Sequence, residues 1–226
     1  MAFPTVESQT TTNFGVDATS HLANYPATVN AGDRLLLLSA FDGTPTITTP
    51  SDYTIVDVVT GADPVVGVYT KIAAGTEGGG TIDVATSASE RGGVSIYRLS
   101  GTSRTVGDVA IAWSTATTSS PNPPNLAPSW GSADNLWFCA CSASAGTTDS
   151  ANSSGYGNRV FTGTAATTNA AIVHLRKTAT ASSDDPSAWT WGSSVNITAF
   201  TIAVKPAPPS LPPMNNRTFR VWNKRG

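Results

Sequence analysis

The chain has 226 residues, of which 39% are hydrophobic and only 12% are charged, and its net charge is −2. A charged fraction about half the usual value, with few good helix formers and much Thr, Ser and Gly, favours strands and turns over helices. The low net charge and the well-formed apolar segments exclude an intrinsically disordered chain, and no run of 18 apolar residues is present that would predict a membrane-spanning helix.

Strand patterns follow one another along the first half of the chain. Arg34–Phe41 is a nearly continuous apolar run, which predicts a central strand buried on both faces. Shorter patterns follow at Tyr53–Val59, Val65–Ala73, Thr81–Ala85 and Val94–Leu99, with turns rich in Gly, Asp and Pro between them. These segments predict an all-β fold.

The pattern starts again in the second half, after a strand pattern at Val106–Trp113 and a Pro-rich loop at Ser119–Pro128. Ala133–Cys141 resembles Gly32–Ala40, and in both segments an Asp leads an apolar strand. The alignment pairs Phe138 with Leu37 and, farther along the chain, Ile202 with Ile96. Such self-similarity predicts two structural repeats of about 100 residues each.

The two halves, at about residues 8–101 and 102–206, allow two interpretations: two separate domains, or one fused sandwich. The segment between them has a strand pattern of its own and is not a bare linker, which favours one body over residues 1–206. We expect a two-sheet antiparallel β-sandwich, jelly-roll-like, in which the long apolar strands of both halves share one core.

Residues 207–226 form a tail of different composition. The tail begins with a Pro-rich segment, predicted to be extended, and has a net charge of +4, whereas the body has nine basic and 15 acidic residues and a net charge of −6. One interpretation is a disordered end; the other is a docking segment that adds Thr218–Trp222 to a partner's sheet or inserts Arg and aromatic anchors. The predicted docking residues are Arg217, Phe219, Arg220, Val221, Trp222, Lys224 and Arg225.

Residues typical of catalysis are few. His21 falls in a polar loop pattern and His174 in a strand pattern, so we expect one solvated and one half-buried histidine. Asp184 and Asp185 stand before a Pro, which is typical of a turn rather than of the separated carboxyl pair of a glycosidase. The sequence therefore predicts no catalytic residue, no metal site, no cofactor and no enzyme.

Two further groups have both a structural and a functional interpretation. Cys139 and Cys141 are expected to be small buried residues, since no second Cys or His pair is present to complete a zinc site. Lys71, Arg176 and Lys177 recur at matching points of the two halves. They form either a solvated strand face or a symmetric basic spot that meets acidic groups of a neighbouring chain.

Trp189 and Trp191 lie on one face of a short predicted strand. Their structural interpretation is core packing. Their functional interpretation is a platform on which sugar rings stack, which would make them possible glycan contacts.

Several segments carry a resemblance to a known family. They are Asn30–Leu38, Thr49–Thr54, Tyr69–Gly79 and Ser95–Gly101, with Asp185–Pro186 and Thr201–Pro206 in the second half. The chain from about residue 8 to residue 206 resembles structural proteins from virions of tailed phages, jelly-roll-like capsid decoration or tail-associated proteins. The resemblance implies a non-enzymatic virion protein and no fixed site residues.

We therefore expect a capsid decoration, cement or head-fibre protein that docks through its tail on the major capsid protein or on fibre and tail proteins. Trimers are common among such modules, so a homo-oligomer is expected, with neither nucleic acid, given the acidic body, nor a membrane as partner. The alternatives are a tail-fibre module that reads host surface polysaccharide and, third, a depolymerase. The first 15 residues lack the features of a secretion signal. This suits a protein assembled in the host cytoplasm and displayed on the outer surface of the virion.

Overall fold

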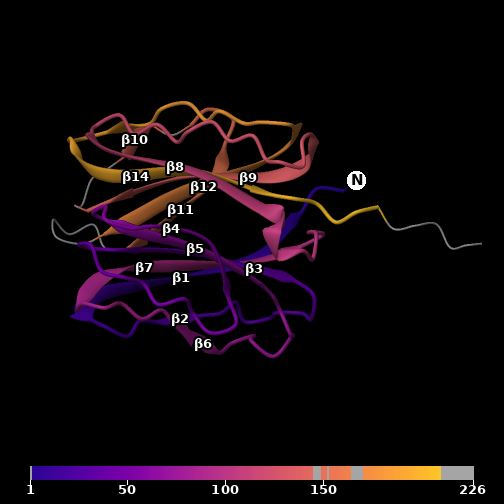
Figure 1. Cartoon of the computed structure of the whole chain (residues 1–226), viewed down its shortest axis with the longest axis horizontal. Helices are drawn as coiled ribbons and strands as arrows, with labels where there is room; N and C mark the ends of the chain where they lie inside the picture. Colours follow the sequence, from indigo (N-terminus) through magenta and orange to yellow (C-terminus); the bar gives the residue numbers. More distant parts are fainter. Residues whose placement is uncertain (1, 145–148, 152, 164–169, 210–226) are drawn as a thin grey trace, which may run out of the picture.

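The computed structural model describes residues 2–144, 149–151, 153–163 and 170–209. Within these ranges strands dominate, and the one helical element is a single 3-10 turn, η1 (Val106–Asp108). Figure 1 shows two layers of strands stacked face to face, with the first half of the chain in the lower layer and the second half in the upper layer. The predicted antiparallel β-sandwich is confirmed.

Each of the two sheets is built from the strands of one half. The first sheet has the spatial order β1 (Thr5–Ala18), β7 (Glu90–Ser100), β3 (Arg34–Phe41), β5 (Val65–Ile72) and β4 (Thr54–Val59). The second sheet has the spatial order β8 (Val109–Thr118), β14 (Val195–Val204), β9 (Ala133–Ala143), β12 (Ala171–Ala181) and β11 (Gly157–Gly163). Every strand of the first sheet thus has a counterpart at the same position in the second sheet.

Two short antiparallel strand pairs lie outside the sheets. They are β2 (Leu22–Asn24) with β6 (Thr81–Asp83), and β10 (Asp149–Ala151) with β13 (Thr190–Trp191). In Figure 1 the first pair lies beneath the first sheet, and β10 of the second pair lies at the top of the upper layer. Each five-stranded sheet is therefore covered by the other sheet on its inner face and by its own short strands and loops on its outer face.

The continuous apolar run of β3 follows from this double covering. Successive residues of a strand point to opposite faces. Leu36 and Leu38 pack in the core between the sheets, whereas Leu35 and Leu37 pack in the core between the first sheet and its outer covering. The prediction of a central strand buried on both faces is confirmed.

Strand β9 repeats the same division in the second sheet. Leu136 and Phe138 pack in the core between the sheets, and Cys139 and Cys141 pack in the outer core of the second half. The two cysteines are buried and are not joined in a disulfide. They act as small core residues, as the sequence predicts.

The structure corrects the register of the repeat by one residue. Phe138 and Ile202 lie in the core between the sheets, whereas the residues aligned with them in sequence, Leu37 and Ile96, lie in the outer core of the first half. A slip of one residue exchanges the two faces of a strand. The sequence hid this slip because both faces of these strands are apolar.

Arg34 begins β3 and is fully buried. Its Nη1 donates a hydrogen bond to Oγ1 of Thr70 at 3.0 Å, and its Nη2 donates to the carbonyl oxygens of Ser103 at 2.6 Å and Thr105 at 2.7 Å. Burial lowers the pKa of Arg34 to about 10, although the charge of Asp108 acts in the opposite direction. Arg34 thus ties the segment that leads into the second half to the first sheet.

We expect the substitution Arg34→Leu to lower the free energy of unfolding by about 3 kcal/mol, because it leaves two carbonyl oxygens and a hydroxyl without their charged donor. The control is Arg91→Leu, because Arg91 is 32% exposed in its ion pair with Asp17. This substitution should lower the free energy of unfolding by at most about 1 kcal/mol. Urea denaturation measures both losses. Equal losses would show that Arg34 contributes no more than a surface cation.

Candidate functional site

A cleft opens between the two sheets along the flank formed by β1 and β11. Strand β11 pairs with β12 only as far as Gly157, opposite Arg176, so the end of β12 has a partner strand on one side only. The cleft has a volume of about 530 Å³ and is lined by residues 3–6 across from residues 176–178, with Leu136, Gly155, Gly157 and Asn158 between them. Two of these lining residues are cationic and none is acidic.

Arg176 points from β12 toward the first sheet and is half-buried. Its guanidinium carbon lies 5.8 Å from the centre of the Tyr97 ring, within the range of a cation–π contact. No carboxylate among the described residues forms an ion pair with it. The charge of Arg176 is therefore not neutralised where it lines the cleft.

A buried polar cluster lies behind Arg176 and joins the two sheets. The Tyr97 hydroxyl lies 2.7 Å from Nδ1 of His174, whose Nε2 lies 3.0 Å from Oγ of Ser95. The Ser95 hydroxyl lies 2.5 Å from Oγ1 of Thr162. Burial, together with the charge of Arg176, lowers the pKa of His174 to about 3, so the ring is neutral at physiological pH.

The contact between Ser95 and His174 resembles that of a nucleophile and its base, with Tyr97 in the place of the orienting group. All three side chains are buried, with exposed fractions of 0%, 0% and 1%. A substrate cannot reach them in this structure. The cluster therefore fixes one sheet against the other instead of forming an open catalytic site.

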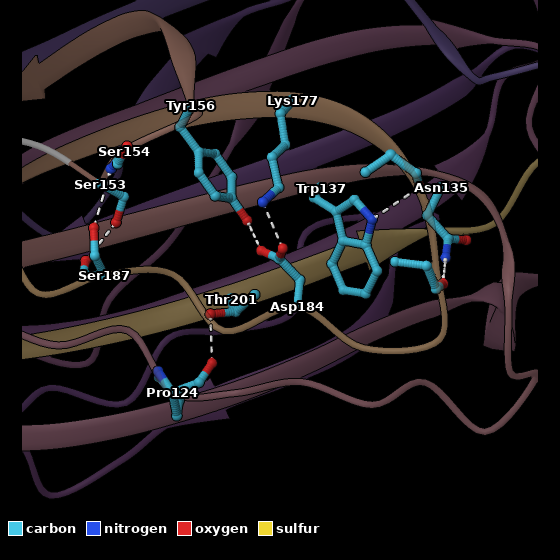
Figure 2. A network of polar contacts seen from close by, with 12 residues as sticks. Pro124, Asn135, Trp137, Ser153, Ser154, Tyr156, Lys177, Asp184, Ser187 and Thr201 are labelled. Atoms are coloured by element: carbon cyan, nitrogen blue, oxygen red, sulfur yellow. Dashed lines mark hydrogen bonds and ion pairs between the residues drawn. The ribbon is translucent and has the colours of Figure 1, made fainter.

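Lys177 points to the opposite face of β12, because neighbouring residues of a strand alternate sides. Its Nζ lies 2.5 Å from Oδ1 of Asp184 and 4.4 Å from the centre of the Tyr156 ring. The Tyr156 hydroxyl donates a hydrogen bond to the same carboxylate, as Figure 2 shows. Asp184 is fixed by two backbone hydrogen bonds with Leu126, so this network holds a loop over the outer face of the second sheet.

Lys71 makes an equivalent ion pair in the first half. Its Nζ lies 3.0 Å from Oε1 of Glu77 and 5.5 Å from the centre of the Tyr53 ring, and its side chain is 11% exposed. Both lysines are engaged in ion pairs within the chain, Lys71 at 11% exposed and Lys177 at 24%, so the symmetric basic spot is wrong for these two residues. Only Arg176, of the three, brings its charge to the cleft.

The structure also corrects the glycan platform predicted at Trp189 and Trp191. Both indoles are buried in the outer core of the second half, with exposed fractions of 0% and 5%. The indole nitrogen of Trp189 donates a hydrogen bond to Oγ of Ser153 at 2.9 Å. Neither ring offers a face to a sugar, and core packing is the correct interpretation.

His21 is not the solvated residue expected from its polar surroundings in the sequence. It is fully buried, with Nδ1 at 2.9 Å from the carbonyl oxygen of Val84 and Nε2 at 3.0 Å from that of Glu90. Its ring packs against Phe14 and Phe41. Both histidines are core residues, since the loops that contain polar residues cover the sheets.

The tail leaves the body beside the cleft. The amide of Ala207 donates a hydrogen bond to the carbonyl oxygen of Gly101 at 2.7 Å, and Gly101 packs against residues 3 and 4, which line the cleft. Figure 1 shows the N-terminal segment and the exit of the tail at the same end of the sandwich. The predicted docking residues, Arg217, Phe219, Arg220, Val221, Trp222, Lys224 and Arg225, lie outside the described residues.

Other kinds of site find no support in the described part of the chain. It contains no group of three or more His, Cys, Asp or Glu side chains placed to hold a metal ion, and none of its helices is long and apolar enough to cross a bilayer. No protein-family model, no curated protein and no solved structure matches this chain. The candidate site therefore rests on its own geometry.

We expect the buried polar cluster to make stability depend on pH through His174. The unfolded chain binds a proton at this residue below about pH 6.5, whereas the folded protein binds it only near pH 3, so the free energy of unfolding falls as the pH drops between these values, by up to about 1.4 kcal/mol per pH unit. His174→Gln removes this dependence.

Urea denaturation of both proteins at pH 7.5, 5.5 and 4.5 measures the effect. The free energy of unfolding of the wild type minus that of His174→Gln should fall at each step toward acid. The other titrating groups are the same in both proteins, so their contributions cancel in this difference. A difference that stays constant with pH would contradict the proposed role of His174.

Proposed function

We propose that this protein is a non-enzymatic structural protein of a virion, a capsid decoration or head-fibre protein that docks through its C-terminal tail. The observation that carries the proposal is that, at one end of the sandwich, an acidic body gives way to a basic tail. The backbone is fixed to the body up to Ala207, and beyond it the sequence changes from a body of net charge −6 to a tail of net charge +4.

Two features of the body support a structural role. Its Ser–His pair is enclosed between the sheets, and no acidic residue lines the cleft beside Arg176, so at neither place do the described residues form an open site for general acid–base chemistry. Both faces of each sheet are also occupied by the chain's own residues. A body of this kind presents a rigid surface and leaves its ends for attachment.

The alternative function, a receptor-binding module for host polysaccharide, has less support. Its proposed contacts, Trp189 and Trp191, are in the core. Among large apolar side chains, Trp113 is 42% exposed, but its indole nitrogen donates to Asp57, which holds the ring at the opposite flank of the sandwich. We therefore favour attachment over glycan recognition.

Deletion of residues 210–226 tests the proposal, because it removes the basic aromatic segment and keeps every described residue of the body. We expect the truncated protein to keep its melting temperature and to be lost from virus particles purified on a density gradient. A second variant replaces the four tail cations Arg217, Arg220, Lys224 and Arg225 with Gln, and we expect it to occupy the virus particles less fully than the wild type. Full occupancy of the truncated protein would contradict docking through the tail.

A further inference from the structure

We propose that the cleft beside Arg176 receives an acidic side chain from an extended segment of the protein on which this chain docks. The inference rests on the proposed function and deepens it, because the cleft opens at the end of the body from which the tail leaves. The tail and the cleft would then hold the partner at two separate points.

Charge is the first argument for this occupant. The body has 15 acidic and nine basic residues, yet no acidic residue lines the cleft, and Arg176 brings its charge there. Lys177 is already paired with Asp184, so Arg176 supplies the charge that faces a ligand. The preferred ligand group is a carboxylate, which the planar fork of an arginine binds through two parallel hydrogen bonds.

The second argument is that Arg176 is held in place before a ligand arrives. Its backbone lies in β12 between Gly157 of β11 and Phe138 of β9. Its guanidinium carbon lies 5.8 Å from the centre of the Tyr97 ring, and the Tyr97 hydroxyl in turn contacts Nδ1 of His174 at 2.7 Å. Little side-chain entropy remains to be lost on binding, and the half-buried position strengthens a charge-assisted hydrogen bond.

The third argument is the shape of the cleft, which suits an extended peptide. Beyond Arg176, β12 is paired with β9 alone, so one edge of its backbone is open for the addition of a strand. A volume of about 530 Å³ accommodates one or two side chains. Phe3, Val6 and Leu136 line the cleft as apolar neighbours for the residues that flank the acid.

The tail of the chain itself is a less suitable occupant. The tail contains four cations and no acid, so Arg176 would repel it. At Gly155 and Gly157 an added Cβ would meet no atom within 4 Å, which shows that the body leaves this side of the cleft open. An acidic segment of a different protein therefore fits better than a second tail.

The probe is a pair of blocked pentapeptides, acetyl-Thr-Val-Glu-Leu-Thr-amide and the same peptide with Gln in place of Glu, titrated into the ¹⁵N-labelled full chain. We expect saturable shifts of the amide signals of Gly157, Arg176 and Thr178 with a millimolar dissociation constant, and at least fivefold weaker binding of the Gln peptide. Arg176→Gln should abolish the preference for Glu, and Arg176→Lys should restore it in part. The matched control, Arg91→Gln at an ion pair with Asp17, should keep the full preference.

Equal shifts with the two peptides, or an unchanged preference in Arg176→Gln, would overturn the inference. Shifts of the same signals when the protein is concentrated without peptide, lost in Arg176→Gln, would assign the cleft to a second copy of the chain and would also overturn it. If the truncated protein is lost from particles but the full chain binds no peptide, only the proposal for the cleft is rejected. If the full chain binds the peptide but the truncated protein still occupies the particles fully, only docking through the tail is rejected.

Discussion

The structure depends on two sheets that pack against each other while each is covered on its outer face by its own loops. Such a sheet needs central strands that are apolar on both faces, and β3 and β9 meet this need by sending alternate residues into the inner and outer cores. The inner core is not wholly apolar. The cluster of Ser95, Tyr97, Thr162 and His174 connects the sheets, and a shift of one sheet over the other would leave these buried groups without hydrogen bonds.

Much of the fold could be predicted from the sequence because strand periodicity and turn residues are local signals. The long apolar strands, the antiparallel sandwich and the internal similarity were all visible in this way. The register of the repeat was not, since in a strand that is apolar on both faces a shift by one residue changes no pattern. The sorting of each half into its own sheet also depends on long-range packing, which no local segment encodes.

The candidate site was less predictable, because its meaning lies in contacts between distant residues. The sequence drew attention to Arg176 and Lys177 together, but the alternation of β12 sends one to the cleft and the other to Asp184. It also assigned Trp189 to a possible surface, since a sequence does not show which loops cover a short strand. A lone histidine in an apolar strand, with Ser95 and Tyr97 at alternate positions of another strand, was the one available signal of the buried cluster.

The same packing decides where a partner can bind. Both faces of each sheet are used by the chain itself, which leaves the strand edges and the ends of the sandwich. At the flank of β4 and β8 the sheets are joined by the hydrogen bond from Trp113 to Asp57 at 2.9 Å. At the flank of β1 and β11, the shortness of β11 leaves the end of β12 without a partner strand on that side and opens the cleft. The attachment proposed at that flank would use the open backbone edge of β12 and the charge of Arg176, which forms no ion pair with a carboxylate among the described residues.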